Sequence, residues 1–109
     1  MTTYKYHAEK PALVGVKYDK DKPRCGLVLG DFNRALLAVS DVGTFGAEKY
    51  TPKGWLGVLN GEERYKDALY RHLLKSEYEA ADSESGIDHL AHLAWNALAI
   101  LELKLRSVE

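Results

Sequence analysis

Apolar side chains recur at steps of three and four residues through three stretches of the chain, and this spacing predicts three helices. The first predicted helix begins at Asp31, whose carboxylate can accept hydrogen bonds from the free N–H groups of the first turn. It ends before Thr51-Pro52, because the residue before a proline disfavours helical geometry. Its positions predicted to face inward are Phe32, Ala35, Leu36, Val39, Val42 and Phe45.

The second helix is predicted over residues 61–80, where two glutamates at its start suit the positive end of the helix dipole. The segment ADSESG at 81–86 breaks it, and Ser83 or Ser85 is the predicted N-cap of the third helix. That third helix is expected from about residue 87 to about residue 106. The stripe of the second helix that is predicted to face inward is Tyr65, Ala68, Leu69, His72, Leu73 and Ser76.

Outside these three stretches, the apolar residues show no sustained helical or strand-like spacing. Residues 1–26 are predicted to form an irregular arm, in which the segment VGVKY is too short to be a convincing strand. We therefore predict one all-α domain over residues 1–109, a small helical bundle with its helical core at 27–109. Because three helices make a thin core, a homodimer or homotetramer that buries Trp95 and Leu98 is expected.

Composition narrows the class of protein. The chain has 109 residues, is 46% hydrophobic and 28% charged, and carries a net charge of −1, as ordinary globular domains do. This charge argues against stable binding to nucleic acid, although the basic arm keeps that possibility open. The single Cys25 favours a reducing, cytoplasmic setting. The polar N-terminus lacks a signal-peptide core and the longest apolar run, residues 93–101, is too short to cross a membrane, so no membrane partner is expected.

The most informative stretch is GIDHLAHLAWNALAIL at 86–101, which places polar groups in an apolar helix. At about 100° per residue, His89, His92 and Asn96 fall within roughly 60° of one another. His72 lies on the apolar face of the preceding helix. Buried polar groups need partners. Two interpretations stay open: a core network satisfied by Asp67, His72 or backbone carbonyls, and a site for a metal ion or ligand.

Acidic residues lie close to this stripe along the chain and offer the oxygen ligands that Mg²⁺ prefers. Two of them, Glu77 and Glu84, are more simply explained as solvated surface charges. Zn²⁺ bound through His89 and His92 is a weaker alternative, because a third ligand has to come from elsewhere. The acids of this segment are Glu77, Glu79, Asp82, Glu84 and Asp88.

Two further sets suit a nucleotide. In GAEKY and the loop after it, Tyr50 and Trp55 could stack on a base while Lys49 meets a phosphate. The alternative is that both aromatic rings cap the bundle core. The basic residues of the arm also suit phosphate, although a solvated arm is the simpler interpretation and no P-loop signature is present. These arm residues are Lys17, Lys20, Lys22 and Arg24.

Taken together, the segments GVKYDKDKPR, FGAEKYTPKGW and RYKDALYRHLLKSEYEAADSESGIDHLAHLAWNAL resemble a phage and bacterial family described as dATP/dGTP diphosphohydrolases. These proteins are thought to be relatives of the MazG-like all-α nucleoside-triphosphate pyrophosphohydrolases. The resemblance runs from about residue 15 to about residue 103. It implies a helical, Mg²⁺-dependent enzyme, with Mn²⁺ as a substitute, that cleaves a purine deoxynucleoside triphosphate to the monophosphate and pyrophosphate.

The resemblance also implies roles for residues. The implied catalytic group is His72, His89, His92 and Asn96, and the implied metal ligands are Asp67, Glu79 and Asp82. The substrate-binding group would be Lys20, Lys22, Arg24, Lys49, Tyr50, Trp55 and Arg71. The chain departs from the better-known MazG-like enzymes, which hold metal with a glutamate cluster and a Glu–Asp pair, and Tyr78 stands where a glycine is expected. A non-catalytic helical module that binds a nucleotide or a protein is therefore the alternative function.

Overall fold

The computed structural model describes residues 14–107, and the first thirteen residues of the predicted arm lie outside the described part. Within it the chain is all-α, as predicted, and residues 14–18 form no strand. The only β-type pairing in this part is an isolated bridge between Ala81 and Asp88. The elements are α1 (Cys25–Leu29), the 3₁₀ turn η2 (Gly30–Phe32), α2 (Asn33–Lys49), the 3₁₀ turn η3 (Gly54–Gly57), α3 (Gly61–Ser76) and α4 (His89–Ser107).

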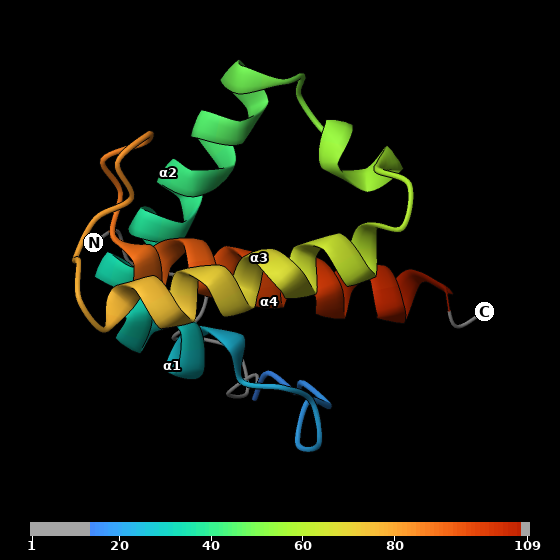
Figure 1. The fold of residues 1–109 in the computed structure, drawn as a ribbon. Helices are drawn as coiled ribbons and strands as arrows, with labels where there is room; N and C mark the ends of the chain where they lie inside the picture. The colour runs from blue at the N-terminus through green and yellow to red at the C-terminus, as the bar shows by residue number, and fades with distance from the viewer. Residues whose placement is uncertain (1–13, 108–109) are drawn as a thin grey trace.

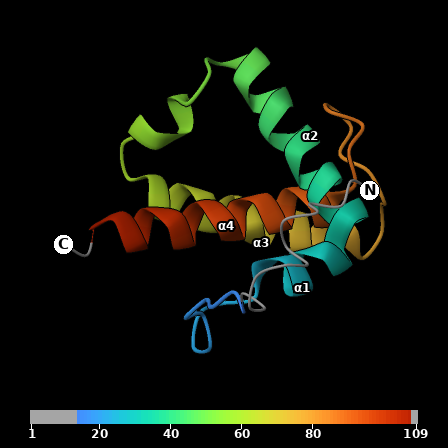
Figure 2. The same cartoon turned by 180° about the vertical axis from the view of Figure 1, so that it is seen from behind.

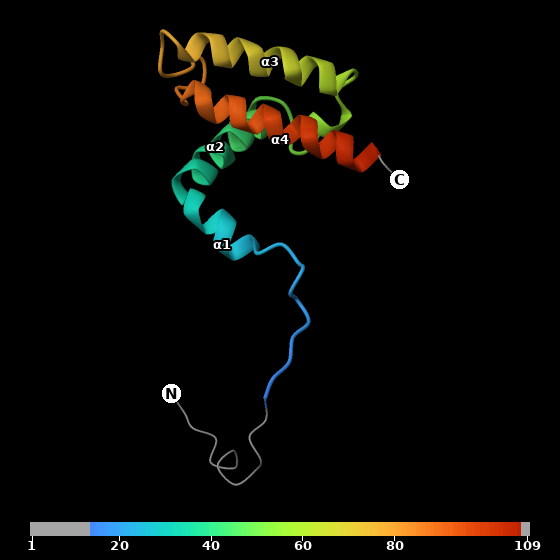
Figure 3. The same ribbon diagram turned by 90° about the horizontal axis from the view of Figure 1, so that it is seen from below.

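Two helices form the centre of the molecule. α3 and α4 run antiparallel and side by side, and α2 crosses α4 on another side (Figure 1, Figure 3). The view from behind shows α4 in front of α3, with η3 joining the far end of α2 to α3 (Figure 2). Residues 14–24 leave α1 on the side away from α3, and all of them are exposed (Figure 3). No described helix combines the length and the apolarity that crossing a membrane requires.

The first helical segment starts earlier than predicted. Helical geometry begins at Cys25 and continues through η2 into α2, so Asp31 lies inside a 3₁₀ turn and caps nothing. Gly30 has φ −62° and ψ −19°, an ordinary helical conformation, and no proline lies between Cys25 and Pro52. The end of the segment is as predicted, because α2 stops at Lys49, just before Thr51-Pro52.

The boundaries around the α3–α4 loop also differ from the prediction. α3 ends at Ser76 rather than at residue 80, and the N–H groups of the next three residues bond back to Leu74 and Lys75 carbonyls. α4 begins at His89, and its cap is Asp88 rather than Ser83 or Ser85. Asp88 Oδ1 accepts a hydrogen bond of 2.8 Å from the Leu90 N–H, the usual N-cap arrangement.

The core is small. Among the described residues the buried apolar side chains are Val42, Ala91 and Ala99. The stripe predicted along the first helix is inward only in its second half, since Phe32 and Leu36 remain 53% and 36% exposed. The bundle therefore leaves apolar side chains of α1 and the start of α2 in contact with solvent.

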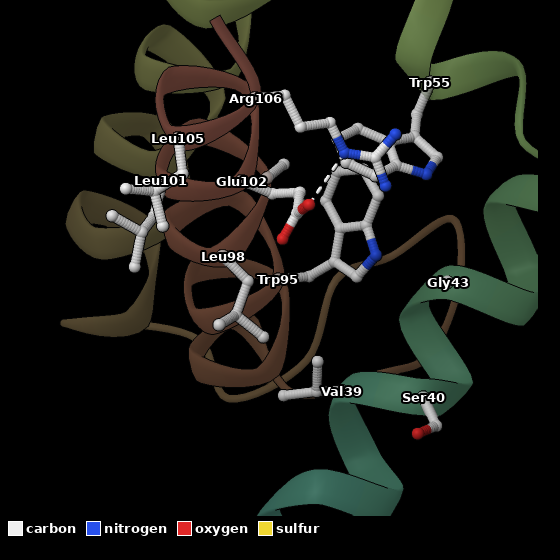
Figure 4. A pocket seen from close by; sticks show the side chains of 11 residues that line it. Val39, Ser40, Gly43, Trp55, Trp95, Leu98, Leu101, Glu102, Leu105 and Arg106 are labelled. Atoms are coloured by element: carbon white, nitrogen blue, oxygen red, sulfur yellow. Dashed lines mark hydrogen bonds and ion pairs between the residues drawn. The ribbon is translucent and has the colours of Figure 1, made fainter. Parts of the chain in front are cut away.

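An aromatic cluster holds η3 against the central pair. The rings of Trp55, Tyr65 and Trp95 meet edge to face, with centroids 5.5–6.2 Å apart. The Tyr65 hydroxyl donates a hydrogen bond of 2.6 Å to the Trp55 carbonyl. Beside the two tryptophans, an open cavity of about 520 Å³ lies between α2 and α4 (Figure 4).

Candidate functional site

The loop over residues 77–88 folds into a closed turn that carries acidic side chains back to the helices. The Asp82 N–H donates to the Ile87 carbonyl at 2.8 Å, and the His89 N–H donates to the Ala80 carbonyl at 2.9 Å. Gly86 has φ +74°, a conformation that glycine adopts without steric cost, and its N–H donates to the Asp82 carbonyl at 2.7 Å. The segment DSESG thus fixes the position of Asp82 relative to the start of α4.

His89 is the centre of the site and is 0% exposed. Its Nε2 lies 2.8 Å from Glu79 Oε1, and its Nδ1 lies 2.9 Å from His72 Nδ1. Because an ionised carboxylate only accepts, the Nε2–H of His89 donates to Glu79. In a neutral ring the Nδ1 of His89 then carries a lone pair, so the Nδ1–H of His72 is the donor between the two imidazoles.

His92 is held by a second small network. Asp82 Oδ2 accepts hydrogen bonds from the Ser85 N–H at 2.8 Å and from the Ser85 hydroxyl at 2.9 Å. Ser85 Oγ also lies 2.7 Å from His92 Nε2. Since the hydroxyl hydrogen is directed to Asp82, the Nε2–H of His92 donates to Ser85. The ring of His92 stacks on that of His72, with centroids 4.4 Å apart and planes 10° from parallel.

The environment favours neutral imidazoles beside an ionised carboxylate. Burial, and then the neighbouring His92 and His89 rings, lower the pKa of His72 to about 4. Burial also lowers the pKa of His92, although the Asp82 carboxylate opposes this. Burial alone would raise the pKa of Asp82, but the hydrogen bonds from Ser85 outweigh it and the pKa lies below its ordinary value. At neutral pH, His72 and His92 therefore have lone pairs available for a ligand.

Asn96 completes the polar stripe but does not touch an imidazole. It is 5% exposed, and its Nδ2 donates to the His92 carbonyl at 2.8 Å. The stripe faces inward as predicted, with His89, His92 and Asn96 all buried. No buried side-chain nitrogen or oxygen of residues 14–107 lacks a hydrogen-bond partner, so the stripe is a satisfied network.

The same network contains a set of potential metal ligands. One ligand atom each from His72, Asp82 and His89 lie within 4.8 Å of one another. Glu79 stands behind His89 and is not one of these three. This set differs from the predicted ligands Asp67, Glu79 and Asp82, of which only Asp82 belongs to it.

The remaining predicted residues lie at different distances from this cluster. Asp67 and Arg71 are exposed on α3, and Asp67 forms no ion pair with another described residue. Lys49 does reach the loop, because its Nζ lies 2.7 Å from Glu84 Oε2, and this hydrogen bond raises the pKa of Lys49. The Lys49 ammonium also lies 5.1 Å from the ring centroid of Tyr50, which is 71% exposed.

Trp55 and the arm lie outside the cluster. Trp55 belongs to the aromatic cluster with Tyr65 and Trp95, which agrees with the alternative that it caps the core. Lys20, Lys22 and Arg24 are exposed in the segment that leads away from the bundle (Figure 3).

Ser85 and Glu84 are site residues whose roles the sequence did not indicate. The sequence predicts Ser85 as a possible cap, and Glu84 as an acid near the stripe that is more simply explained as a solvated surface charge. The signal for Ser85 is its place three residues after Asp82 and before Gly86, which suits a turn in which the aspartate accepts the serine N–H. Glu84 binds Lys49 from a helix far away in sequence, a pairing that local patterns do not indicate.

Comparison with known proteins identifies the chain at the level of a family. No curated protein and no solved structure matches it. Residues 14–109 match the family model described as dATP/dGTP diphosphohydrolase, N-terminal, a range that includes every residue of the site above. The match covers most of the 109 residues, and the chain therefore belongs to the dATP/dGTP diphosphohydrolase N-terminal family.

Proposed function

We propose that this chain hydrolyses a purine deoxynucleoside triphosphate, dATP or dGTP, to the monophosphate and pyrophosphate. Membership of the family supports a nucleotide hydrolase. The observation that carries the proposal is the grouping of His72 and His89 with Glu79 and Asp82 at the junction of α3, the loop and α4. Closely placed imidazoles and carboxylates are groups that orient water and bind metal-complexed phosphates.

The chemistry requires a water in line with the leaving pyrophosphate and positive charge around the phosphate oxygens. His72 is the imidazole of this pair that reaches the surface, because it is only partly buried whereas His89 is 0% exposed. We assign to His72 the orientation of the attacking water. Glu79 and His89 act as positioning residues, since Glu79 fixes the hydrogen on His89 and His89 in turn holds the His72 ring.

The phosphates need cations as well. Lys49 lies beside the loop that carries Asp82, and Arg71 is the neighbour of His72 on α3. In this proposal both bind phosphate oxygens, and a bound triphosphate displaces Glu84 from Lys49. The exposed ring of Tyr50, next to Lys49, is a surface on which a purine can stack. Lys20, Lys22 and Arg24 remain proposed phosphate contacts from the arm.

Mg²⁺ fits this site only in part. It prefers oxygen ligands and keeps several waters, and it is commonly held by one or two carboxylates together with substrate phosphates. The three grouped ligand atoms include two imidazole nitrogens and one carboxylate oxygen, so they do not form a site for Mg²⁺ on their own. We retain Mg²⁺, or Mn²⁺ in its place, as the ion that accompanies the triphosphate.

The test is pyrophosphate release from each of the eight common nucleoside triphosphates with Mg²⁺ or Mn²⁺. We expect release from dATP or dGTP. In His72→Gln we expect kcat/KM to fall by about 100-fold, the usual loss for a group that handles the attacking water. Glu79→Gln should lower it by about 10-fold or more through misplacement of the rings. Glu77→Gln is the matched control for Glu79→Gln, because Glu77 is an exposed acid that lies two residues before Glu79 and outside the cluster.

A non-catalytic nucleotide-binding or protein-binding module is the alternative, and one observation favours it. No buried polar side-chain atom of residues 14–107 lacks a hydrogen-bond partner even without a ligand, as in a purely structural network. Under this alternative no triphosphate releases pyrophosphate, and a nucleotide that binds without turnover raises the unfolding temperature. Turnover that survives in both His72→Gln and Glu79→Gln would contradict the assignment of the site.

A further inference from the structure

We propose that His72, His89 and Asp82 form a site for a divalent transition-metal ion such as Co²⁺ or Zn²⁺. The site is the one used in the proposed function, and the inference rests on that function only for the ion's role in hydrolysis. The ion would be held by one ring nitrogen each of His72 and His89 and by one carboxylate oxygen of Asp82, from residues placed by α3, the loop and the start of α4. For both Nδ1 atoms to bind it, the hydrogen on His72 Nδ1 moves to the Nε2 of the same ring, so that the ion replaces the hydrogen bond between the two imidazoles.

The spacing of the two imidazoles suits a shared ion. His72 Nδ1 and His89 Nδ1 are 2.9 Å apart, and all three ligand atoms lie within 4.8 Å. Two nitrogens bound at about 2.1 Å to one ion lie about 3 Å apart at right angles and about 3.4 Å apart in the tetrahedral geometry of Zn²⁺, so a shift of about 0.5 Å or less brings the pair to either separation. The imidazole pair therefore has the separation of two neighbouring ligands.

Residues behind the ligands fix their orientation. Glu79 accepts the Nε2–H of His89 at 2.8 Å, which leaves the Nδ1 lone pair of His89 facing His72. A carboxylate behind a histidine is the usual second support of a metal-bound imidazole. Ser85 gives two hydrogen bonds to Asp82 Oδ2, so the third ligand is also held in place.

The donor types distinguish between metals. Imidazole nitrogens suit Zn²⁺, Co²⁺ and other transition ions, whereas Mg²⁺ selects oxygen ligands in near-octahedral geometry. Two of the three grouped donors are nitrogens. This site should therefore prefer a transition ion to Mg²⁺, which differs from the Mg²⁺ dependence expected from the sequence.

The experiment is a metal titration of the full chain in the Cys25→Ser background, because the exposed thiol is a competing ligand. Chelator-treated protein is titrated with Co²⁺, followed by its visible absorption, and with Zn²⁺, Mn²⁺ and Mg²⁺ by calorimetry. We expect one equivalent of Co²⁺ or Zn²⁺ to bind with a Kd about 100-fold or more below that of Mg²⁺. Helical circular dichroism verifies folding.

Variants locate the ion. His72→Gln and Asp82→Asn should each weaken Co²⁺ binding, and Glu79→Gln should weaken it by about 10-fold through the second support. Glu77→Gln should bind as the parent does. No saturable binding, equal affinity for Mg²⁺, or unchanged binding in folded His72→Gln and Asp82→Asn would overturn the inference. The titration contains no nucleotide, so its result is independent of hydrolysis. A protein that binds Co²⁺ as expected but releases no pyrophosphate contradicts only the proposed function. A protein that hydrolyses dATP or dGTP but does not prefer Co²⁺ or Zn²⁺ to Mg²⁺ contradicts only this inference.

A separate observation concerns the outer face of α4. Leu90, Leu98, Leu101 and Leu105 are 50–59% exposed, and their spacing places them along one face of the helix. Ala94 and Ala97 are the other residues of this face, so it carries no charge from Leu90 to Leu105. Continuous exposed apolar strips of this kind mark interaction surfaces.

The homo-oligomer expected from the sequence supplies an occupant for this strip, and we propose that two copies of the chain pair through it with their α4 helices antiparallel about Leu98. Asp88 precedes α4, and Lys104 and Arg106 lie in its last turn, so antiparallel pairing brings opposite charges together whereas parallel pairing brings like charges together. The strip is continuous with the cavity in Figure 4, whose wall includes Leu98, Leu101 and Leu105. With only Val42, Ala91 and Ala99 buried among apolar residues 14–107, a second copy also completes the core.

Light scattering after size exclusion tests this pairing. We expect twice the monomer mass at micromolar concentration, reduced to the monomer mass in Leu101→Glu. Leu74→Glu is the matched control, since Leu74 is 65% exposed on α3 outside the strip, and should leave the mass unchanged. In Cys25→Ser, a Leu98→Cys substitution near the two-fold axis should crosslink two chains on oxidation, and Leu74→Cys should not. A monomeric parent chain, or a dimer unaffected by Leu101→Glu without the Leu98→Cys crosslink, would overturn the proposal.

Discussion

At the scale of single residues, the site depends on which atom of each imidazole carries hydrogen. Glu79 fixes the tautomer of His89, and His89 then fixes that of His72. Ser85 does the same for His92 through its bond to Asp82. The hydrogen positions follow from two carboxylates at the ends of two short chains of hydrogen bonds. Protonation of His72 leaves its Nδ1–H bond to His89 in place but puts a charge on a partly buried ring beside two other imidazoles, so acid should weaken both the site and the fold.

The pKa of His72 determines in which direction, and over which pH range, the free energy of unfolding changes. Its pKa is about 4 in the folded protein and about 6.5 when exposed, so the unfolded chain takes up the proton first as the pH falls. The stabilising contribution is complete above about pH 6.5 and is lost between about pH 6.5 and pH 4. Because His72 is only partly buried, we expect a loss of about 1–2 kcal/mol rather than that of a fully buried group.

Urea unfolding of the metal-free protein at pH 7.5, 6 and 5 measures this loss. In His72→Gln the free energy of unfolding should depend less steeply on pH than in the parent chain, whatever its level at pH 7.5. Leu74→Gln, two residues along the same helix, should retain the parent slope. If the free energy of unfolding depended on pH equally in the parent chain and in His72→Gln, the pKa of His72 would be the same in the folded and the unfolded chain.

At the scale of elements, periodicity was sufficient for the three long helices but insufficient for their caps. Pro52 and the paired glutamates 62–63 are signals that act locally, and the helix ends beside them are where they were predicted. Asp31, Ser85 and Asp88 are all chemically able to cap a helix. Asp88 caps α4 because Ser85 is already bonded to Asp82 and His92, and that choice depends on the path of the loop.

In the site, too, some features follow from local sequence patterns and others depend on the tertiary fold. The register of His72, His89 and His92 follows from helical spacing, and the structure brings their rings together as expected. Glu79 and Asp82 reach the histidines because contacts between residues 80–82 and 86–89 close the loop. Asp67 lies on α3 outside this loop and does not join the cluster. Trp55 joined an aromatic cluster because η3 folds back onto α3 and α4, which a Gly-rich loop sequence does not disclose.

The contact between α2 and α4 can be tested with two glycines of one helix. A Cβ on Gly43 would lie 3.3 Å from Trp95 Nε1, whereas a Cβ on Gly46 would meet nothing within 4 Å. Both Gly→Ala changes gain helix propensity. Gly46→Ala should therefore raise the free energy of unfolding by about 0.5–1 kcal/mol, and Gly43→Ala should gain less because the indole has to shift.

Urea unfolding gives the two free energies, and tryptophan fluorescence gives an independent signal. The emission of Gly43→Ala should change, since Trp95 is displaced toward the cavity it lines, while that of Gly46→Ala should match the parent chain. Equal stabilisation by both substitutions with unchanged emission would show that α2 does not approach α4 as closely as in Figure 4.

At the scale of the whole molecule, stability is distributed unevenly. Every residue from 25 to 37 is exposed, whereas the buried side chains gather where α4 meets α3 and α2. Segments with few buried contacts open at little free-energy cost, and densely packed segments open only with global unfolding. α4 from His89 to Ala99 should therefore belong to the most stable unit, and α1 to the least stable.

Hydrogen exchange followed by mass spectrometry tests this order. Amides of α4 between His92 and Ala99 should exchange slowest, and those of α1 should exchange fastest among the helices. The same measurement on Leu101→Glu tests the contact between copies. If a partner chain covers only α4, this substitution should speed amide exchange in the second half of α4, while the amides of α1 exchange as fast as they do in the parent chain. Slow exchange in α1 that becomes fast in Leu101→Glu would instead place α1 inside the contact between copies, because protection lost with the partner can come only from the partner.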